Sequence, residues 1–438
     1  MPKIYRLCFK NFCESFWKKM DGKASLLAAI VLALLLSQVT MAQSKQPVAP
    51  QFDSILSTSW AAYKQQFIQP DGRVVDWMND GGTTSEGQSY AMLRAVWMND
   101  PQTFHICFGW TLANLRVRND KLFAWRWGHD AKQNSYGVLD RSSAADADED
   151  IAVALILASR RWQNPSYLNP AREIINDIWD QEVVIVQGQP YLVAGDWSKA
   201  WGHPAINPSY LAPYAYRMFD EVDPDRNHKW LGLVDSSYRV IEESSKLSLV
   251  GLPPDWCAIN RETGTLEPSE LNGETSGDYS YDAWRVMWRL TVDAEWNDEP
   301  RAINYIKSGK FLIDFWRKNE HLCESYMSTG QVRSDQEPIS QLGIHLPAFA
   351  IIDKRIAKKI FDDKLMASYD RLGKRGFWGN PKDYYSQNWA WLGIALYAGT
   401  VESYCGNGSD LCRNSASARD HRKGSAKISL AAQPVPEQ

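Results

Sequence analysis

The chain has 438 residues and a formal net charge of −4, and 44% of its residues are hydrophobic while 23% are charged. This balance is typical of a globular protein with a large core and excludes a disordered chain. The chain has no excess of positive charge that would attract nucleic acid, so we expect no nucleic-acid partner. The 20 Trp residues are an excess of large rings, which fill cores or provide flat platforms for the apolar faces of ligands.

Residues 1–42 have the pattern of an export signal. Basic residues precede a mostly apolar stretch at 24–36, and Thr40 and Ala42 place small residues three and one positions before a cut after Ala42. The apolar stretch is shorter than the roughly 20 residues that span a bilayer. We therefore expect a periplasmic or secreted protein cleaved near Ala42, with an uncleaved amino-terminal membrane anchor as the alternative.

Helical spacing of apolar residues dominates the chain after a short linker at 43–50, and strand-like alternation is rare. Candidate helices begin near Asp53, Gly87, Gln102, Glu149, Asn169, Ser209, His228, Tyr281, Glu299, Pro338, Arg355 and Tyr384. An all-α domain is therefore expected over 51–412, built from stacked helical hairpins or from a closed ring of them. Residues 413–438 are polar and poor in aromatic residues, which predicts a flexible tail.

The cysteines and histidines indicate no metal site. No Cys-x-x-Cys pair occurs and the seven His are scattered, so neither a metal nor a cofactor is expected. Cys405 and Cys412 bracket a turn-rich loop, and an oxidising compartment would allow a disulfide between them.

Three junctions between loops and helices carry the unusual polar residues. In the first, Glu86 stands at the start of a helix, where Thr84 or Ser85 would cap the amino terminus. A structural role beside the helix dipole is the simpler interpretation, and the dipole would lower the pKa of Glu86. A general acid needs a raised pKa, so a catalytic role requires burial of Glu86 or a second carboxylate nearby.

The second junction concentrates acids, with Asp146, Asp148, Glu149 and Asp150 in one loop before an apolar helical stripe. A solvated acidic turn is the structural alternative. A calcium loop is a further alternative, although the glycine and the distal bidentate Glu of an EF-hand are missing.

In the third junction, Asp282 and Arg285 are three residues apart and would share one face of a helix. A guanidinium at that distance would hold the Asp ionised, which is the state that a general base requires. A plain intrahelical ion pair is the alternative, and the neighbouring Tyr279, Tyr281 and Trp284 favour a site.

Taken together, these junctions resemble glycoside hydrolase family 8, over roughly residues 71–397. The stretch from Ala144 to Trp162 is similar to the family signature, with one departure: Ala145 occupies a Ser or Thr position and removes a hydroxyl beside Asp146. The family fold is an (α/α)6 barrel of six inner and six outer helices, in agreement with about twelve helices expected from periodicity.

The resemblance implies catalytic roles. Glu86, in Thr-Thr-Ser-Glu-Gly-Gln-Ser-Tyr, matches the proton donor, and Asp282, in Tyr-Ser-Tyr-Asp-Ala, matches the base that activates water. Asp146 matches a third acid that contacts the sugar at the cleavage point, and its charge would raise the pKa of Glu86. An inverting pair should stand about 6.5 to 9.5 Å apart. The candidates for contacting the sugar chain are Trp125, Trp127, Trp197, Trp201, Tyr210, Tyr281, Arg285, Tyr384 and Tyr385.

Within the family, the chain looks most like the endoglucanases that accompany bacterial cellulose synthesis. That resemblance implies a β-1,4-linked glucan substrate and an association with a cellulose synthase complex. We also expect a monomer. Xylan and chitosan are alternative substrates. A non-catalytic glycan-binding barrel is an alternative of a different class, and a sugar lyase or epimerase would favour His or Tyr as the base.

Overall fold

The computed structural model describes residues 50–370 and 375–404, which belong to one compact unit beginning at Ala49. The predicted signal, nearly all of the predicted linker, the Cys405 and Cys412 pair and the predicted tail lie outside the described residues. None of the helices in these two ranges combines the length and the apolar character that crossing a bilayer requires.

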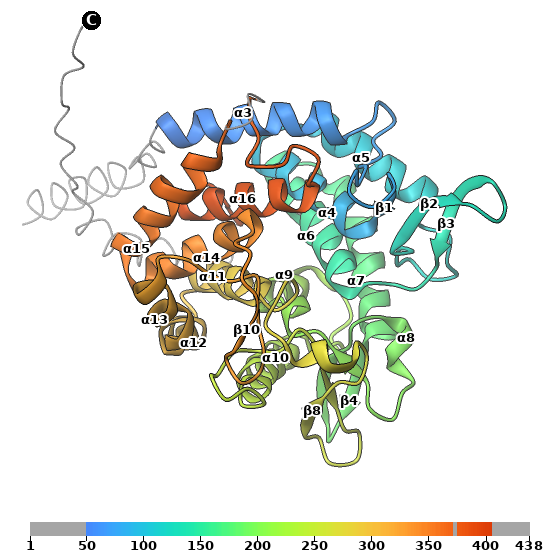
Figure 1. The fold of residues 1–438 in the computed structure, drawn as a ribbon. Helices are drawn as coiled ribbons and strands as arrows, with labels where there is room; N and C mark the ends of the chain where they lie inside the picture. Colours follow the sequence, from blue (N-terminus) through green and yellow to red (C-terminus); the bar gives the residue numbers. More distant parts are fainter. Residues whose placement is uncertain (1–49, 371–374, 405–438) are drawn as a thin grey trace, which may run out of the picture. The chain divides into compact units, whose positions relative to one another are not determined.

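Fourteen α-helices form about half of the described part of the chain (Figure 1). They are α3 (Pro50–Phe67), α4 (Ser85–Trp97), α5 (Pro101–Asn114), α6 (Ala145–Arg161), α7 (Leu168–Glu182), α8 (Asp196–Lys199), α9 (Pro213–Val222), α10 (Trp230–Ser245), α11 (Arg285–Asn297), α12 (Pro300–Ser308), α13 (Lys310–Asn319), α14 (Ile339–Ile352), α15 (Lys354–Lys359) and α16 (Tyr384–Tyr397).

Six of these helices form a closed inner ring. Contacts run from α4 to α6, α9, α11, α14 and α16 in turn, and α16 contacts α4 again. Each inner helix packs against one outer helix, so that α3 covers α16, α5 covers α4, α7 covers α6, α10 covers α9, α12 covers α11 and α15 covers α14. Inner and outer helices alternate along the chain. This is the expected (α/α)6 barrel, with α8 and α13 as additions.

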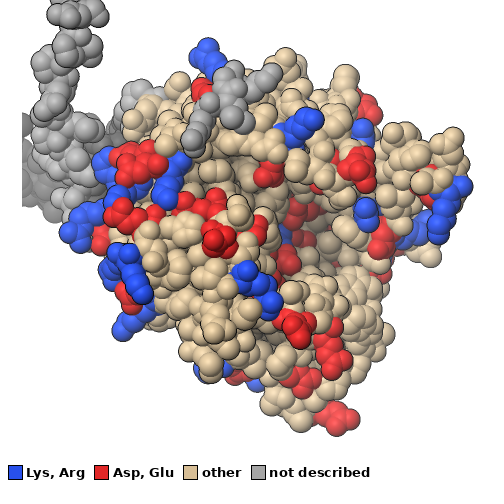
Figure 2. All heavy atoms as spheres, in the orientation of Figure 1, with Lys and Arg blue, Asp and Glu red and all other residues tan. Residues whose placement is uncertain are grey.

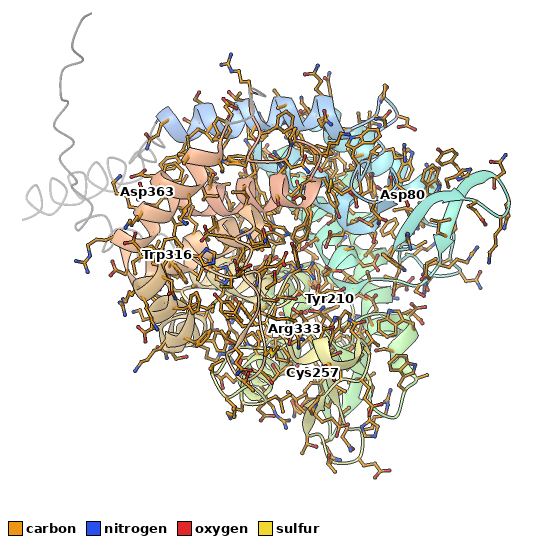
Figure 3. The ribbon with its side chains drawn as sticks, viewed as in Figure 1. Asp80, Tyr210, Cys257, Trp316, Arg333 and Asp363 are labelled. Atoms are coloured by element: carbon orange, nitrogen blue, oxygen red, sulfur yellow. The ribbon has the colours of Figure 1, made fainter. Side chains whose placement is uncertain are left out.

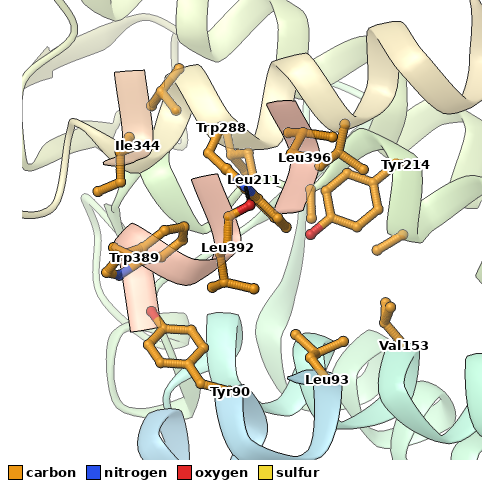
Figure 4. Close-up of a cluster of buried hydrophobic side chains, with 14 of the residues drawn as sticks. Tyr90, Leu93, Val153, Leu211, Tyr214, Trp288, Ile344, Trp389, Leu392 and Leu396 are labelled. Carbon is orange, nitrogen blue, oxygen red and sulfur yellow. Dashed lines mark hydrogen bonds between the residues drawn. The ribbon is translucent and has the colours of Figure 1, made fainter. Parts of the chain in front are cut away.

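The core lies inside the inner ring. Figure 4 shows Tyr90, Leu93, Val153, Leu211, Tyr214, Trp288, Ile344, Trp389, Leu392 and Leu396 meeting there, all of them buried. The indole of Trp288 donates a hydrogen bond of 3.2 Å to the carbonyl of Leu392, which satisfies a polar atom inside the apolar cluster. Gly343 and Gly393 bring the backbones of α14 and α16 into direct contact, because a Cβ on either glycine would clash with the opposite backbone.

Short antiparallel strands lie in the loops between the helices. They are β1 (Thr83–Thr84), β2 (Arg126–Asp130) and β3 (Ser135–Asp140) in one sheet, β4 (Val183–Val186) with β5 (Gln189–Leu192), β6 (Ala205–Ile206), β7 (Cys257–Ile259) and β8 (Leu266–Pro268) in another sheet, and β9 (Ser325–Tyr326) with β10 (Val332–Ser334). The expectation of few strands overlooked these pairs, because their short runs give little alternation.

The twelve helices expected from periodicity are all present, although some of the predicted starts were wrong. Helix α6 begins at Ala145, four residues before the expected Glu149, and α11 begins at Arg285 and not near Tyr281. Helix α9 begins at Pro213, because residues 208–210 form a separate 3-10 turn. Helix α13 was missed because only Gly309 separates it from α12.

Candidate active site

The three candidate acids meet at one end of the barrel, where the inner helices begin. Glu86 is the second residue of α4, Asp146 is the second residue of α6, and Arg285 and Tyr384 open α11 and α16. Because an outer helix returns the chain after each inner helix, the amino termini of the inner helices share one end of the barrel. In Figure 2 this view of the surface is hollowed near its centre, and acidic side chains lie inside the hollow.

Arg285 joins all three acids. Its Nη1 lies 2.9 Å from Oε2 of Glu86 and 2.9 Å from Oδ2 of Asp146, and its Nη2 contacts Oδ1 of Asp282 at 2.5 Å. The guanidinium is buried, with 2% of its side chain exposed. The sequence thus correctly paired Asp282 with Arg285, but Asp282 lies in a turn before α11 and not on the helix itself.

Glu86 has the environment that a general acid requires. Thr84 caps α4 by accepting a hydrogen bond of 3.0 Å from the amide of Gly87, so Glu86 is not needed as the cap. Burial raises the pKa of Glu86 to about 7, with help from the charges of Asp146 and Asp282, while Arg285 and a hydrogen bond from Tyr384 oppose the rise. The predicted effect of burial and of a second carboxylate therefore outweighs the lowering by Arg285 and Tyr384.

The pKa of Asp282 differs from the expectation that Arg285 holds this carboxyl ionised. Its side chain is partly exposed, and burial raises its pKa above the ordinary value, with a further upward contribution from Asp146. Arg285 and the Asn207 amide lower the pKa but do not reverse the shift. Arg285 therefore limits the rise caused by burial, and it does not hold the pKa below the ordinary value.

The acids of the second junction are buried helical residues and not a solvated turn. Asp146 and Asp150 lie one turn apart on α6, and Arg285 and Arg289 lie one turn apart on α11. Arg289 forms an ion pair with Asp150 at 2.9 Å, one turn further along the two helices than the ion pair of Arg285 with Asp146. Two ionic contacts therefore link α6 and α11, and these helices are not neighbours in the inner ring.

Asp148 and Glu182 form a buried acidic pair behind this site. The pKa of Asp148 is raised well above its usual range by burial and by the charge of Glu182. Burial also raises the pKa of Glu182 to about 8. The hydroxyl of Ser143 donates a hydrogen bond of 2.6 Å to Glu182, and its oxygen accepts one of 3.0 Å from the amide of Asp196. Ala145 lacks the hydroxyl that the family signature has at this position. The hydroxyl of the nearby Ser143 anchors the loop instead.

The aromatic candidates on the α8 side form one cluster. The rings of Trp197 and Trp201 meet edge to face at 5.1 Å, and Trp256 lies beside Trp197 and Tyr210. Trp201 is 43% exposed. Tyr210, labelled in Figure 3, also lies over the guanidinium of Arg285 at 5.3 Å. The cluster therefore extends from the three acids toward solvent.

Trp125 and Trp127 lie on or beside the hairpin of β2 and β3. The carbonyl of Trp125 accepts a hydrogen bond of 3.0 Å from the amide of Ser85, next to Glu86. The ring of Trp127 packs against Arg73, Trp110 and Tyr136, so it serves the packing of the hairpin as well.

The two tyrosines that open α16 contact Glu86 and the turn that carries Asp282. Tyr384 is buried and donates a hydrogen bond of 2.8 Å to Oε1 of Glu86. Tyr385 donates a hydrogen bond of 2.9 Å to the carbonyl of Tyr281, beside Asp282. Tyr281 is 44% exposed and its ring tilts over Trp284 at 4.5 Å.

Sequence reasoning missed one acid of this region. Asp255 accepts hydrogen bonds from the turn that carries Asp282, and only the fold brings it there, because its own segment has no recognisable pattern. Within residues 50–370 and 375–404, no group of three or more His, Cys, Asp or Glu side chains is arranged to hold a metal ion.

Comparison with known proteins agrees with this fold. Residues 25–362 match the family model of the glycosyl hydrolases family 8, and the chain belongs to that family. The chain is 37% identical over 241 residues to an endoglucanase of Xanthomonas axonopodis pv. citri, an alignment that covers 54% of this chain and 60% of that relative. It is 30% identical over 394 residues to endoglucanase A of Acetivibrio thermocellus, which covers 83% of this chain and 78% of that protein.

A solved structure shows the same architecture. The endo-1,4-D-glucanase of Vibrio fischeri ES114 superposes with a TM-score of 0.66 at 27% identity, covering 77% of this chain and 94% of the other. The likeness therefore extends over the barrel as a whole.

Proposed function

We propose that this family 8 member is an inverting endo-β-1,4-glucanase in which Glu86 is the general acid and Asp282 is the general base. One observation carries the proposal: a single buried guanidinium, that of Arg285, gathers Glu86, Asp282 and Asp146 at the open end of the barrel. Two carboxylates in different environments are what acid and base catalysis on a glycosidic bond requires.

The reaction follows from the states of the two carboxyl groups. Below about pH 7 Glu86 carries a proton, which it donates to the leaving oxygen of the glycosidic bond. Asp282 is ionised and takes a proton from a water that attacks the sugar carbon from the opposite face, so the configuration inverts. Asp146, held by Arg285, contacts the sugar at the point of cleavage and keeps a negative charge near Glu86.

The relatives support β-1,4-glucan as the substrate. The three proteins described above carry names of glucan-cleaving enzymes, and the exposed Trp201 with Trp197 offers rings on which glucose units could stack. Chitosan would need acids for its amino groups, and most of the acids near Asp146 are buried and so do not offer them. Xylan is the alternative substrate that the activity assay distinguishes from β-1,4-glucan.

We further propose that the chain acts outside the cytoplasm, beside bacterial cellulose synthesis, as a monomer with its catalytic domain at 51–412. The amino-terminal pattern up to Ala42 and the family resemblance support export. Mass measurement of the protein recovered from the periplasm tests whether the signal is cleaved after Ala42. A chain that begins after Ala42 supports cleavage, and an intact chain in the membrane fraction supports the anchor.

The activity is tested by release of reducing sugar from carboxymethylcellulose, xylan and chitosan, comparing the wild type with Glu86→Gln and Asp282→Asn. We expect activity on the cellulose derivative that falls by at least about 10²-fold in either variant. Glu173→Gln, at an exposed ion pair, is the matched control and should keep full activity. Activity on another polymer alone would change the substrate, and none on any polymer would favour a glycan-binding barrel.

A further inference from the structure

Asp255 is a buried carboxylate that the proposed reaction does not use. It lies between α10 and β7, and 7% of its surface is exposed. Its Oδ1 accepts hydrogen bonds from the amides of Ser280, at 3.1 Å, and Ala283, at 2.8 Å. Its Oδ2 accepts a short hydrogen bond from the hydroxyl of Ser280. These three bonds reach across 25 residues or more to a single turn.

That turn is the one that carries Asp282. Ser280 and Ala283 flank Asp282 along the chain, so the side chain of Asp255 fixes the backbone on both sides of it. The first helical residues that follow have no local cap, because Trp284 makes no capping hydrogen bond through its side chain. The first amides of α11 bond to carbonyls of the turn, as Arg285 does to Asp282 at 3.1 Å, so Asp255 holds the turn on which α11 begins.

The backbone around Asp255 is itself held firmly. Its amide donates a hydrogen bond of 2.8 Å to the carbonyl of Asp278, and the side chain of Asp278 pairs with Arg333, which is labelled in Figure 3. Because the backbone of Asp255 is fixed, its carboxylate is able to fix the position of the turn to which it is hydrogen-bonded.

We propose that Asp255 is a positioning residue that holds Asp282 in place to activate water. The inference rests on the proposed function, in which Asp282 is the base. Asp255 lies behind the turn and contacts it through backbone amides, so it acts through Asp282 and not on the sugar.

The charge of Asp255 offers an independent readout. Burial raises the pKa of Asp255 to about 7, with an upward contribution from Asp282. The other titratable groups that face it are Tyr279 in the same segment and Tyr385 of α16, and Arg285 is the nearby cation bound to Asp282. Because an ionised Asp282 raises the pKa of Asp255, Asp255 still carries its proton where Asp282 titrates, so a neutral residue at position 255 should leave the titration of Asp282 unchanged.

The test compares Asp255→Ala and Asp255→Asn in the full chain on a soluble cello-oligosaccharide. Asp255→Ala removes all three bonds, and we expect kcat to fall about 10- to 100-fold while KM changes little, as for a misplaced catalytic group. In Asp255→Asn the amide oxygen still accepts both backbone bonds. This variant should keep most of kcat and leave the acidic limb of the kcat/KM profile in place. Asp353→Ala, which removes a similar cap on the outer helix α15, should leave both readouts unchanged.

Wild-type kcat in Asp255→Ala would overturn the proposal, as would Asp255→Asn with a kcat as low as that of the alanine variant. If Asp255→Ala does not fold, the asparagine variant decides, and an acidic limb that moves then counts against the proposal. Failure of the proposed function looks different, because the wild type itself would then be inactive or Glu86→Gln would be fully active.

Discussion

The hydroxyl of Tyr384 lies 2.8 Å from Oε1 of Glu86 and donates a hydrogen bond to it. A hydrogen bond to the ionised form of a carboxyl lowers its pKa, so Tyr384 opposes the burial that raises the pKa of Glu86 to about 7. The buried phenol and the acid thus set the upper end of the pH range in which Glu86 is able to donate a proton.

Tyr384→Phe should move the alkaline limb of the kcat/KM profile to higher pH. Loss of the hydrogen bond destabilises the ionised form of Glu86, so its proton is kept to a higher pH. The profile is measured on a soluble cello-oligosaccharide in buffers of constant ionic strength. A limb that stays in place would mean that Tyr384 does not control the titration of Glu86.

Asp146→Asn should move the same limb in the opposite direction. The charge of Asp146 raises the pKa of Glu86, and a neutral amide removes that effect while it keeps the shape of the side chain. Activity also falls, so the position of the limb is read from the residual rate. A shift to higher pH would contradict the assignment of Glu86 as the group that titrates there.

Glu182→Gln should remove a pH dependence of stability. The native carboxyl keeps its proton up to about pH 8, whereas in the unfolded chain it loses the proton near its ordinary pKa of 4.5. The native state therefore binds more protons between these values, and its stability falls as pH rises through this window. Gln cannot titrate, and its oxygen still accepts the bond from Ser143.

Urea unfolding at pH 5 and at pH 8 measures this effect. The free energy of unfolding of the variant, relative to the wild type, should increase between the two pH values by on the order of a few kcal/mol. Glu173→Gln on the surface is the control and should show no such change. A pH-independent difference between Glu182→Gln and the wild type would show that Glu182 is ionised in the folded protein.

Trp201→Ala should weaken substrate binding more than it slows the chemical step. The indole is 43% exposed and meets Trp197 edge to face, so we expect its removal to cost little stability. We expect KM to rise by about 3- to 10-fold with kcat nearly unchanged, the loss of one aromatic contact. Leu231→Ala, half exposed on the outer helix α10, is the control. An unchanged KM would remove Trp201 from the binding surface.

The periodicity of apolar residues was sufficient to predict the twelve barrel helices, because each inner helix buries a broad stripe. It failed where local signals were weak. Gly309 joins α12 and α13 almost continuously, and the acids from Asp146 to Asp150 suggested a loop although they lie on α6. Charged residues in a helix are usually exposed, and only the barrel provides Arg285 and Arg289 as partners from α11.

The candidate acids were predictable because Glu86, Asp146 and Asp282 stand in motifs that resemble a known family. Their arrangement was only partly predictable. The pairing of Asp282 with Arg285 is local in the chain, whereas the contacts of Arg285 with Glu86 and Asp146 span 199 and 139 residues. Asp255 could not have been found, since its role depends on amides that its own segment does not contain.

The stereochemistry of the first product tests the central claim most directly. Proton nuclear magnetic resonance spectra recorded within the first minutes of hydrolysis of a soluble β-1,4-glucan show which anomer is released. With Glu86 as acid and Asp282 as base acting on water, the new reducing end should appear first as the α-anomer. A β-anomer formed first would contradict this account, because it would require a covalent intermediate on one of the carboxylates.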